Sequence, residues 1–195
     1  MTQRHALSTA RLDLVPAQPA HAELTWKYLD DERMWNFFPA LRPPTIEALR
    51  QRYERWMHEV PYLGAIERWE NWISLRREDG AAIGEAQATY AGTSVYIAYG
   101  VFPPFRRLGF AREAMEAVLE HARGAHGART GIAEMAAGNA ASAGVARSLG
   151  FTQVATRRDL DPGLGYRGET YVYRRSLEAP TDRVSGGGAN SSASR

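Results

Sequence analysis

The chain has 195 residues, 44% of them hydrophobic, and a formal net charge of +2. This length supports one buried core and leaves no room for a second full domain. Acidic and basic residues nearly balance, so no nucleic-acid surface is predicted, and the lack of cysteine excludes disulfides, thiolate metal sites and a cysteine nucleophile. No run resembles a signal peptide or a membrane span, so we expect a cytoplasmic protein that does not enter membranes.

The chain begins with a predicted strand at residues 11–15 and a helix at 19–29. A loop of unusual aromatic content follows at residues 30–44, and loops are seldom so apolar unless they cover something. Two interpretations stay open: the loop is tucked against the core, or it forms a wall of a substrate pocket. Its aromatic residues are Trp35, Phe37 and Phe38.

A helix is predicted at residues 46–59, followed by strands at 69–77 and 82–91 joined by a hairpin turn at 78–80. The next strand, at residues 95–102, has a period-2 pattern in which both faces are largely apolar, and this is typical of a central strand. The sequence therefore predicts a meander of three consecutive antiparallel strands.

A basic turn separates the strand at 95–102 from an amphipathic helix, whose apolar stripe runs from Ala111 to Ala122 and which Gly124 is expected to end. The first turn of a helix has unpaired N–H groups and a positive dipole end, so this turn, with little side-chain obstruction at Gly109, can hold a phosphate. The plainer interpretation is an ordinary connection whose arginines are solvated. The nearby cations are Arg106, Arg107 and Arg112.

Past this helix, the sequence predicts a strand at residues 129–136 and a short helix at 140–149 capped by Asn139. Two more strands, at 151–156 and 169–174, are joined by a predicted loop at 159–168. We assign residues 1–179 to one domain, and the Gly/Ser-rich stretch at 180–195 to a disordered tail.

Several short motifs together resemble one family. The run from Tyr99 to Ala111 resembles the acyl-coenzyme-A-binding motif of the GNAT superfamily of N-acetyltransferases, whose pattern is Gln/Arg-x-x-Gly-x-Gly/Ala. Other matches resemble the branch that contains the ribosomal-protein alanine acetyltransferases. They are Thr9-Ala10-Arg11-Leu12, Gly84, Asn139-Ala140-Ala141-Ser142 and Leu149-Gly150-Phe151.

The resemblance implies an α+β (α/β) fold with a mixed, mostly antiparallel central sheet of about six to seven strands, splayed open at the middle, with helices on both faces. Acetyl-coenzyme A would be the co-substrate: its pantetheine would lie in the splay, its pyrophosphate on the amides of the turn, and its thiol near Asn139 and Ser142. The implied binding residues are Val101, Phe102, Arg106, Arg107, Leu108, Gly109, Phe110, Ala111, Arg112, Asn139 and Ser142.

Acetyl transfer to an amine needs a polarised carbonyl, a proton donor for the thiolate and a base for the amine. The backbone N–H of Val101 is a candidate for polarising the thioester carbonyl. Many family members have a tyrosine that serves as the general acid where this chain has Ala146. Ser142 is then the remaining hydroxyl that could protonate the thiolate. Several relatives place the base where this chain has Tyr96, so Glu85, Glu134, or water ending on Tyr96 are the substitutes.

The function that follows is transfer of acetyl to a primary amine, on a protein N-terminus, an amino acid or a small molecule, without a metal. The alternative is a non-catalytic acyl-coenzyme-A sensor of the same fold, favoured by the residues at 96 and 146. A homodimer is compatible with the sequence. The acceptor pocket is expected from the segments at 35–44, 69–72 and 159–167, which match no motif.

Overall fold

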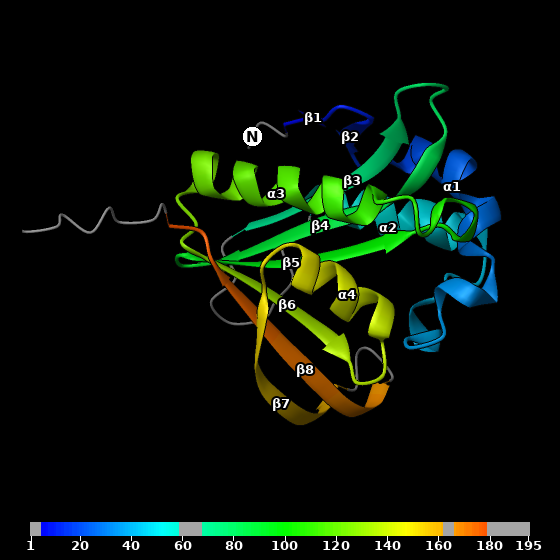
Figure 1. Cartoon of the computed structure of the whole chain (residues 1–195). Helices are drawn as coiled ribbons and strands as arrows, with labels where there is room; N and C mark the ends of the chain where they lie inside the picture. Colours follow the sequence, from blue (N-terminus) through cyan, green and yellow to red (C-terminus); the bar gives the residue numbers. More distant parts are fainter. Residues whose placement is uncertain (1–4, 59–67, 162–165, 179–195) are drawn as a thin grey trace, which may run out of the picture.

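The computed structural model describes residues 5–58, 68–161 and 166–178; the predicted tail at 180–195 lies outside these ranges. Within them, eight strands form one sheet in the order β1-β2-β3-β4-β5-β6-β8-β7, antiparallel except where β5 meets β6 (Figure 1). The strands are β1 (Leu7–Ser8), β2 (Leu12–Pro16), β3 (Arg68–Arg76), β4 (Ala82–Ala91), β5 (Ser94–Val101), β6 (Thr130–Ala136), β7 (Thr152–Asp161) and β8 (Tyr166–Ser176). The predicted mixed sheet is confirmed.

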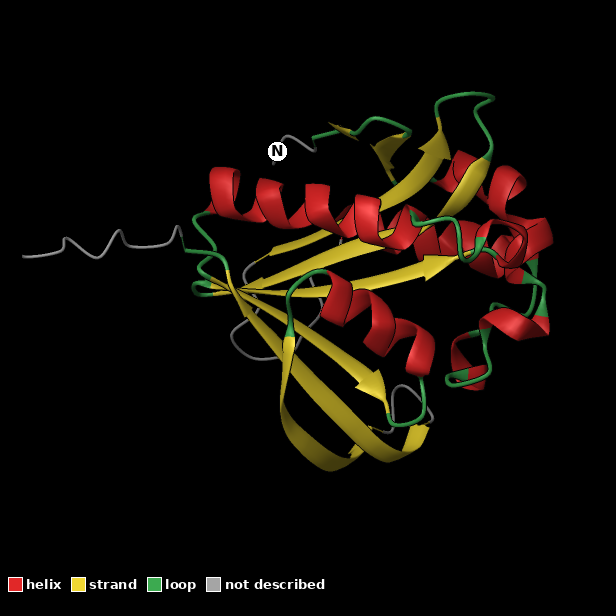
Figure 2. Cartoon of the chain, in the orientation of Figure 1, coloured by secondary structure: helices red, strands yellow, loops and turns green. Residues whose placement is uncertain are grey.

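Helices cover both faces of the sheet, as expected (Figure 2). The helices are α1 (Ala22–Leu29), α2 (Ile46–His58), α3 (Phe110–His126) and α4 (Ala140–Ser148), with 3-10 turns η1 (Pro19–His21), η2 (Glu32–Met34), η3 (Pro39–Leu41) and η4 (Pro103–Phe105). α3 and α4 pack on one face, and α1 and α2 on the other. No helix in the described part of the chain is long and apolar enough to cross a membrane.

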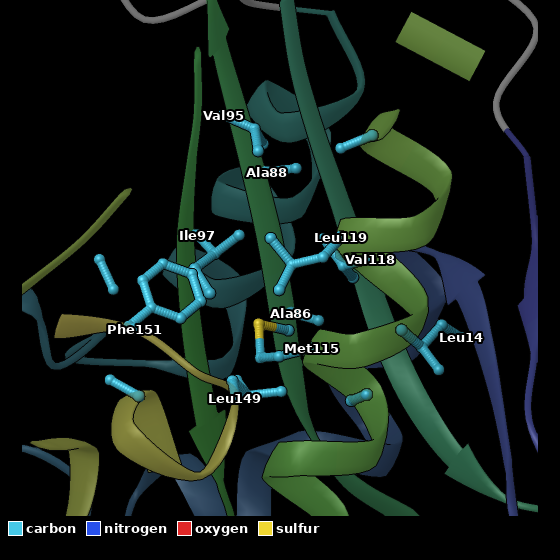
Figure 3. Close-up of a cluster of buried hydrophobic side chains, with 14 of the residues drawn as sticks. Leu14, Ala86, Ala88, Val95, Ile97, Met115, Val118, Leu119, Leu149 and Phe151 are labelled. Atoms are coloured by element: carbon cyan, nitrogen blue, oxygen red, sulfur yellow. The ribbon is translucent and has the colours of Figure 1, made fainter. Parts of the chain in front are cut away.

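The larger core lies between the sheet and α3 (Figure 3). Ala86 and Ala88 of β4 are fully buried, and their small side chains let the helix approach the strands closely. A second core on the opposite face joins α1 and α2 to β3. The labelled side chains of the first core are Leu14, Ala86, Ala88, Val95, Ile97, Met115, Val118, Leu119, Leu149 and Phe151.

The largest departures from the predicted elements concern the end of α3, the expected loop at 159–168 and the N-terminal strand β1. α3 does not end at Gly124 but continues to His126, because Gly127 takes a positive φ of 65° and the Ala128 N–H closes the end on the Ala122 carbonyl at 3.0 Å. The expected loop at 159–168 is largely strand, since β7 and β8 stay paired out to Asp161 and Tyr166. The two-residue strand β1 was not predicted.

The start of α3 is tied to the N-terminal segment through Glu113. Its carboxylate accepts hydrogen bonds from the Thr9 hydroxyl at 2.6 Å, the Arg11 N–H at 2.9 Å and Arg11 Nε at 2.7 Å. Arg11 Nη1 also donates to the Leu108 carbonyl at 3.1 Å. Burial by itself favours a raised pKa for Glu113, but these donors outweigh it and lower the pKa.

Replacing Gly84 with Ala is expected to destabilise the protein, because an added Cβ would lie 2.3 Å from the Gly100 carbonyl oxygen on β5. The two strands would have to separate locally, at a cost of about 1–3 kcal/mol in the free energy of unfolding. Urea unfolding measures the change. Gly124→Ala is the control: it lies inside α3 with open space around it, so it should stabilise by about 0.5–1 kcal/mol. Equal stability for Gly84→Ala and wild type contradicts the close approach.

Glu113→Gln should lower stability by about 1–2 kcal/mol at pH 7, since Arg11 loses a charged partner. A carboxyl with a lowered pKa stabilises the fold above its unfolded pKa of about 4.3, and this contribution disappears as pH falls through the folded pKa. The difference from wild type should therefore shrink below about pH 4. Glu120→Gln, at an exposed position of the same helix, serves as the control. A pH-independent difference argues against the ion pair.

Candidate functional site

The sheet opens between β5 and β6. The two strands pair through Ser94 with Thr130, Val95 with Gly131 and Tyr96 with Ile132, after which they part (Figure 1). On the helix side of the opening, the Tyr99 hydroxyl of β5 donates to the Ser142 carbonyl of α4 at 3.0 Å. The opening is therefore a gap between two strands, with α4 beside it.

Backbone groups of β5 line this gap. The Phe102 N–H donates to the Ile83 carbonyl of β4 at 2.9 Å. Bonded and unbonded pairs alternate along an antiparallel ladder, so Val101 directs its N–H and carbonyl away from β4, toward the gap. Phe102 itself has no free backbone group for a ligand, since its carbonyl accepts from the Phe105 N–H at 2.9 Å. Its ring is fully buried and stacks on Tyr28.

The turn before α3 presents a row of unpaired amides. Gly109 caps the helix with φ 83° and without a side-chain cap, and Arg107 also has a positive φ, of 67°. Residues with positive φ in a turn direct successive backbone N–H groups into one concavity. No described group accepts a hydrogen bond from the backbone N–H groups of residues 107–112. The turn therefore offers amide donors and the positive end of the helix dipole to an anion.

The side chains of the turn divide into two groups. Arg107, Leu108 and Arg112 are exposed, whereas the Phe110 ring is buried below the Arg11 guanidinium at 4.5 Å. Ala111 is half-buried. These positions leave the outer side of the turn open and add positive charge there.

Arg106 does not face the turn. Its Nε donates to the Val101 carbonyl at 3.0 Å, and its Nη2 lies 3.2 Å from the Arg33 carbonyl and 3.1 Å from Met34 Sδ. Arg106, the first residue of the motif, thus links the aromatic segment to the end of β5 by hydrogen bonds. In this structure the Arg106 side chain bonds to protein groups, and its contact with a cofactor stays a prediction.

Asn139 and Ser142 lie at the start of α4, beside the gap. Asn139 Oδ1 accepts from the Ser142 N–H at 3.1 Å, so the expected helix cap is present. The Ser142 hydroxyl has no hydrogen-bond partner among the described residues. Burial raises the pKa of the Tyr99 phenol to about 12, only partly offset by its hydrogen bond to Ser142. Tyr99 thus remains protonated at neutral pH.

Glu85 lies on the opposite face of the sheet, directly across from Gly100 of β5. Its Oε1 accepts from the Tyr53 hydroxyl at 2.6 Å and from Arg52 Nη2 at 2.9 Å, both in α2. Its Oε2 has no partner within the described ranges. Burial, and then the Glu85 charge, raise the pKa of Tyr53, which stays a hydrogen-bond donor. One carboxylate oxygen is therefore fixed and the other is available.

Glu134 and Tyr96 are placed differently. Glu134 of β6 forms an exposed ion pair with Arg157 of β7 at 3.1 Å, a solvated arrangement. Tyr96 lies at the closed end of the gap, 37% exposed, and is four residues before Gly100, or about 13 Å along an extended strand. The structure therefore does not bring Tyr96 together with Glu85.

The aromatic segment at 30–44 packs on the core, and its role as a pocket wall stays a prediction. Trp35 donates from Nε1 to the Leu29 carbonyl at 2.7 Å and packs against the second core. The Met34 methyl lies close to Gly100, where a Cβ would be 3.2 Å away. The segment is thus packed on the core and also borders Glu85's face of the sheet at the end of β5.

The other two segments expected to line the acceptor pocket are those at 69–72 and 159–167. Trp72 is a core residue, 2% exposed, so it cannot be part of an open wall. Trp69 packs edge-on against Trp56. Residues 162–165 of the third segment lie outside the described residues.

Sequence reasoning missed three residues of the site: Tyr99, Arg52 and Tyr53. Tyr53 lies within the helix predicted at 46–59, and a tyrosine hydroxyl needs a partner when it is buried. Arg52 belongs to no motif, and Tyr99 stands at the start of the motif run but has no role assigned from the sequence. The odd-numbered alternation of β5 did place Tyr99 on the same face as Val95 and Ile97. It could not indicate that α4 lies opposite.

Chemically, the turn suits a diphosphate, and the gap suits an extended chain with amide groups that can bond to a strand edge. The amides of the turn and the backbone groups along the gap therefore fit the chemistry of coenzyme A. The open face carries a carboxylate with one free oxygen, which suits an amine.

Solved structures resemble this chain along most of its length. A GNAT-family acetyltransferase from Bacillus anthracis has a TM-score of 0.75 at 18% identity, covering 88% of this chain and 98% of that one. RimL, a ribosomal L7/L12 alpha-N-protein acetyltransferase in complex with coenzyme A, has 0.73 at 17%, covering 88% and 98%. Ribosomal-protein-S5-alanine acetyltransferase from Vibrio fischeri has 0.70 at 14%, covering 88% and 96%.

These identities are low, so the structural likeness shows the fold alone. No curated protein matches the sequence. The sequence profile described as "Acetyltransferase (GNAT) domain" matches residues 11–152, well over half of the chain. That match spans the meander, the amide-rich turn and α4, and the chain therefore belongs to the GNAT family of acetyltransferases.

Proposed function

We propose that this protein transfers the acetyl group of acetyl-coenzyme A to a primary amine, with a protein N-terminus as the first acceptor class to test. The observation that carries the proposal is the row of unpaired amides at residues 107–112, placed at the mouth of the gap between β5 and β6. The acceptor class draws on the similar structures whose names describe ribosomal-protein acetyltransferases.

The diphosphate binds at the turn, where Gly109 and Arg107 aim their amides outward and Arg107 and Arg112 add positive charge. The pantetheine runs along β5 toward Val101, whose N–H faces the gap. This N–H donates to the thioester carbonyl and stabilises the negative charge that grows on the oxygen during attack.

Glu85 acts on the amine from the other face of the sheet. Because Arg52 and Tyr53 hold one oxygen in place, the second oxygen can attract the ammonium ion and accept its proton. Of the candidate carboxylates, we assign this role to Glu85 rather than to Glu134, which is engaged with Arg157 in solvent. Tyr96 lies too far from Gly100 to serve.

Tyr99 is the proton donor in this proposal. The nitrogen–carbon bond forms and the carbon–sulfur bond breaks, so the thiolate must gain a proton as the amine loses one. Tyr99 carries its proton at neutral pH and lies beside Ser142, and its hydroxyl must turn from the Ser142 carbonyl to the sulfur to pass that proton on. Tyr99 thereby takes the role of the tyrosine that the family resemblance implies at position 146. This chain has a buried alanine there. The Ser142 hydroxyl is available to contact the sulfur.

Reversing the charge of the turn with Arg107→Glu and Arg112→Glu should weaken coenzyme A binding about tenfold for each charge. Isothermal titration with coenzyme A, ADP and pantetheine separates the contributions. The loss should affect the two phosphate-bearing ligands and spare pantetheine. Arg123→Glu is the matched control, exposed on the same helix and about 20 Å from the turn. Equal coenzyme A affinity in all variants rejects the turn as the phosphate site.

Glu85→Gln should lower kcat by roughly 10²–10⁴-fold while the affinity for acetyl-coenzyme A is retained, because the variant loses the base but keeps a hydrogen-bonding oxygen. Thiol release with peptides, amino acids and small amines measures turnover. Glu134→Gln is the matched carboxylate control and should retain the wild-type rate. A full rate in Glu85→Gln overturns its role, and binding without turnover of any acceptor favours the sensor alternative.

A further inference from the structure

A second polar cluster lies at the far end of α3, away from the proposed acetyl-transfer site. It consists of Glu70 on β3 and His121 and His126 in the last two turns of α3. The cluster is 12 to 17 residues along the helix from Gly109, which corresponds to roughly 18–26 Å. None of these residues takes part in the proposed reaction.

The ligand atoms of the three side chains converge on one point. Glu70 Oε2 lies 3.1 Å from His121 Nε2, Glu70 Oε1 lies 3.3 Å from His126 Nε2, and the two imidazole Nε2 atoms are 3.3 Å apart. A tetrahedral zinc site with arms of about 2.0–2.1 Å has ligand atoms about 3.3–3.4 Å from one another. Each imidazole nitrogen therefore lies at nearly this spacing from the other and from one of the two Glu70 oxygens, and one ligand atom from each of the three residues lies within 4.8 Å of the others.

Hydrogen bonding alone explains this arrangement poorly. If both rings donate to Glu70, two N–H groups lie 3.3 Å apart and repel; if one does not, its lone pair faces the carboxylate. A cation between them uses both nitrogen lone pairs and the carboxylate together.

The surroundings hold the three ligands in place. The side chains of Glu70, His121 and His126 are 8%, 9% and 15% exposed, and the two rings are nearly perpendicular at 89°. The Tyr90 hydroxyl of β4 donates to Glu70 Oε2 at 2.8 Å, the kind of outer contact that fixes a ligating carboxylate. Arg68 Nη1, at 3.6 Å from Glu70 Oε1, is the one cation of the described neighbours that competes for this carboxylate.

We propose that Glu70, His121 and His126 form a binding site for one divalent transition-metal ion, with zinc as the best match to two imidazoles and a carboxylate. The ion joins β3 to the C-terminal end of α3 and leaves a coordination position for water. Its role is to fix the helix on the sheet, and it takes no part in acetyl transfer.

The test is zinc titration of tag-free, chelator-treated full-length protein, followed by calorimetry and by the visible absorption of the cobalt-substituted protein. We expect one zinc per chain and an absorption typical of four-coordinate cobalt. His121→Ala and His126→Ala should each lower zinc affinity at least tenfold. His58→Ala, an exposed histidine paired with Glu54 on α2, should bind zinc like wild type.

Thermal unfolding gives a second measurement on the same proteins. Zinc should raise the midpoint of wild type and His58→Ala and leave that of His126→Ala unchanged, because an ion that binds the folded chain stabilises it. Glu70→Gln replaces any histidine variant that does not fold. The proposal is overturned if wild type binds no stoichiometric zinc, or if the ligand variants bind it as tightly as wild type. Magnesium, which prefers oxygen ligands, should not bind.

Discussion

The loss of pairing between β5 and β6 after Tyr96 and Ile132 is the constraint on which the rest of the site depends. A sheet that stays paired uses the polar groups of its strand edges internally, and a ligand finds none free. Because these strands part, the Val101 N–H faces a gap that an extended ligand can enter as an added strand does. Tyr99 bonds to Ser142 across the helix side of the opening, so the gap has a defined wall.

α3 connects this gap to two distant anchors. At its start, Glu113 binds Thr9 and Arg11, which sets the position of the amide-rich turn relative to the N-terminal strands. At its end, Glu70 of β3 meets two histidines of the helix. The two anchors differ in chemistry: the first pairs opposite charges, whereas the second brings a carboxylate within 3.1–3.3 Å of two imidazole nitrogens.

The two sides of β5 present different polar groups at the site. The turn exposes Arg107, Arg112 and unpaired amides, whereas the opposite face presents the free oxygen of Glu85 beside Gly100. An anionic cofactor and a cationic amine would therefore be attracted to different sides of the same strand. The neighbouring aromatic rings of Trp35 and Trp56 contact the Arg52 guanidinium and keep the Glu85 network partly dry, which strengthens its electrostatic interactions.

Local patterns were enough to predict the strands and helices after β1, the turn at Gly109 and the cap at Asn139, because periodicity, glycine and capping residues act over a few positions along the chain. They misjudged the end of α3, where Gly124 and Gly127 compete and only the second reaches the left-handed conformation. No local pattern indicated that Arg106 turns back to Val101, that Glu85 meets Arg52 and Tyr53, or that Glu70 meets His121 and His126. These residues lie far apart in sequence or point to faces that depend on neighbouring elements, so their meeting follows from sheet register and helix placement rather than from any local pattern.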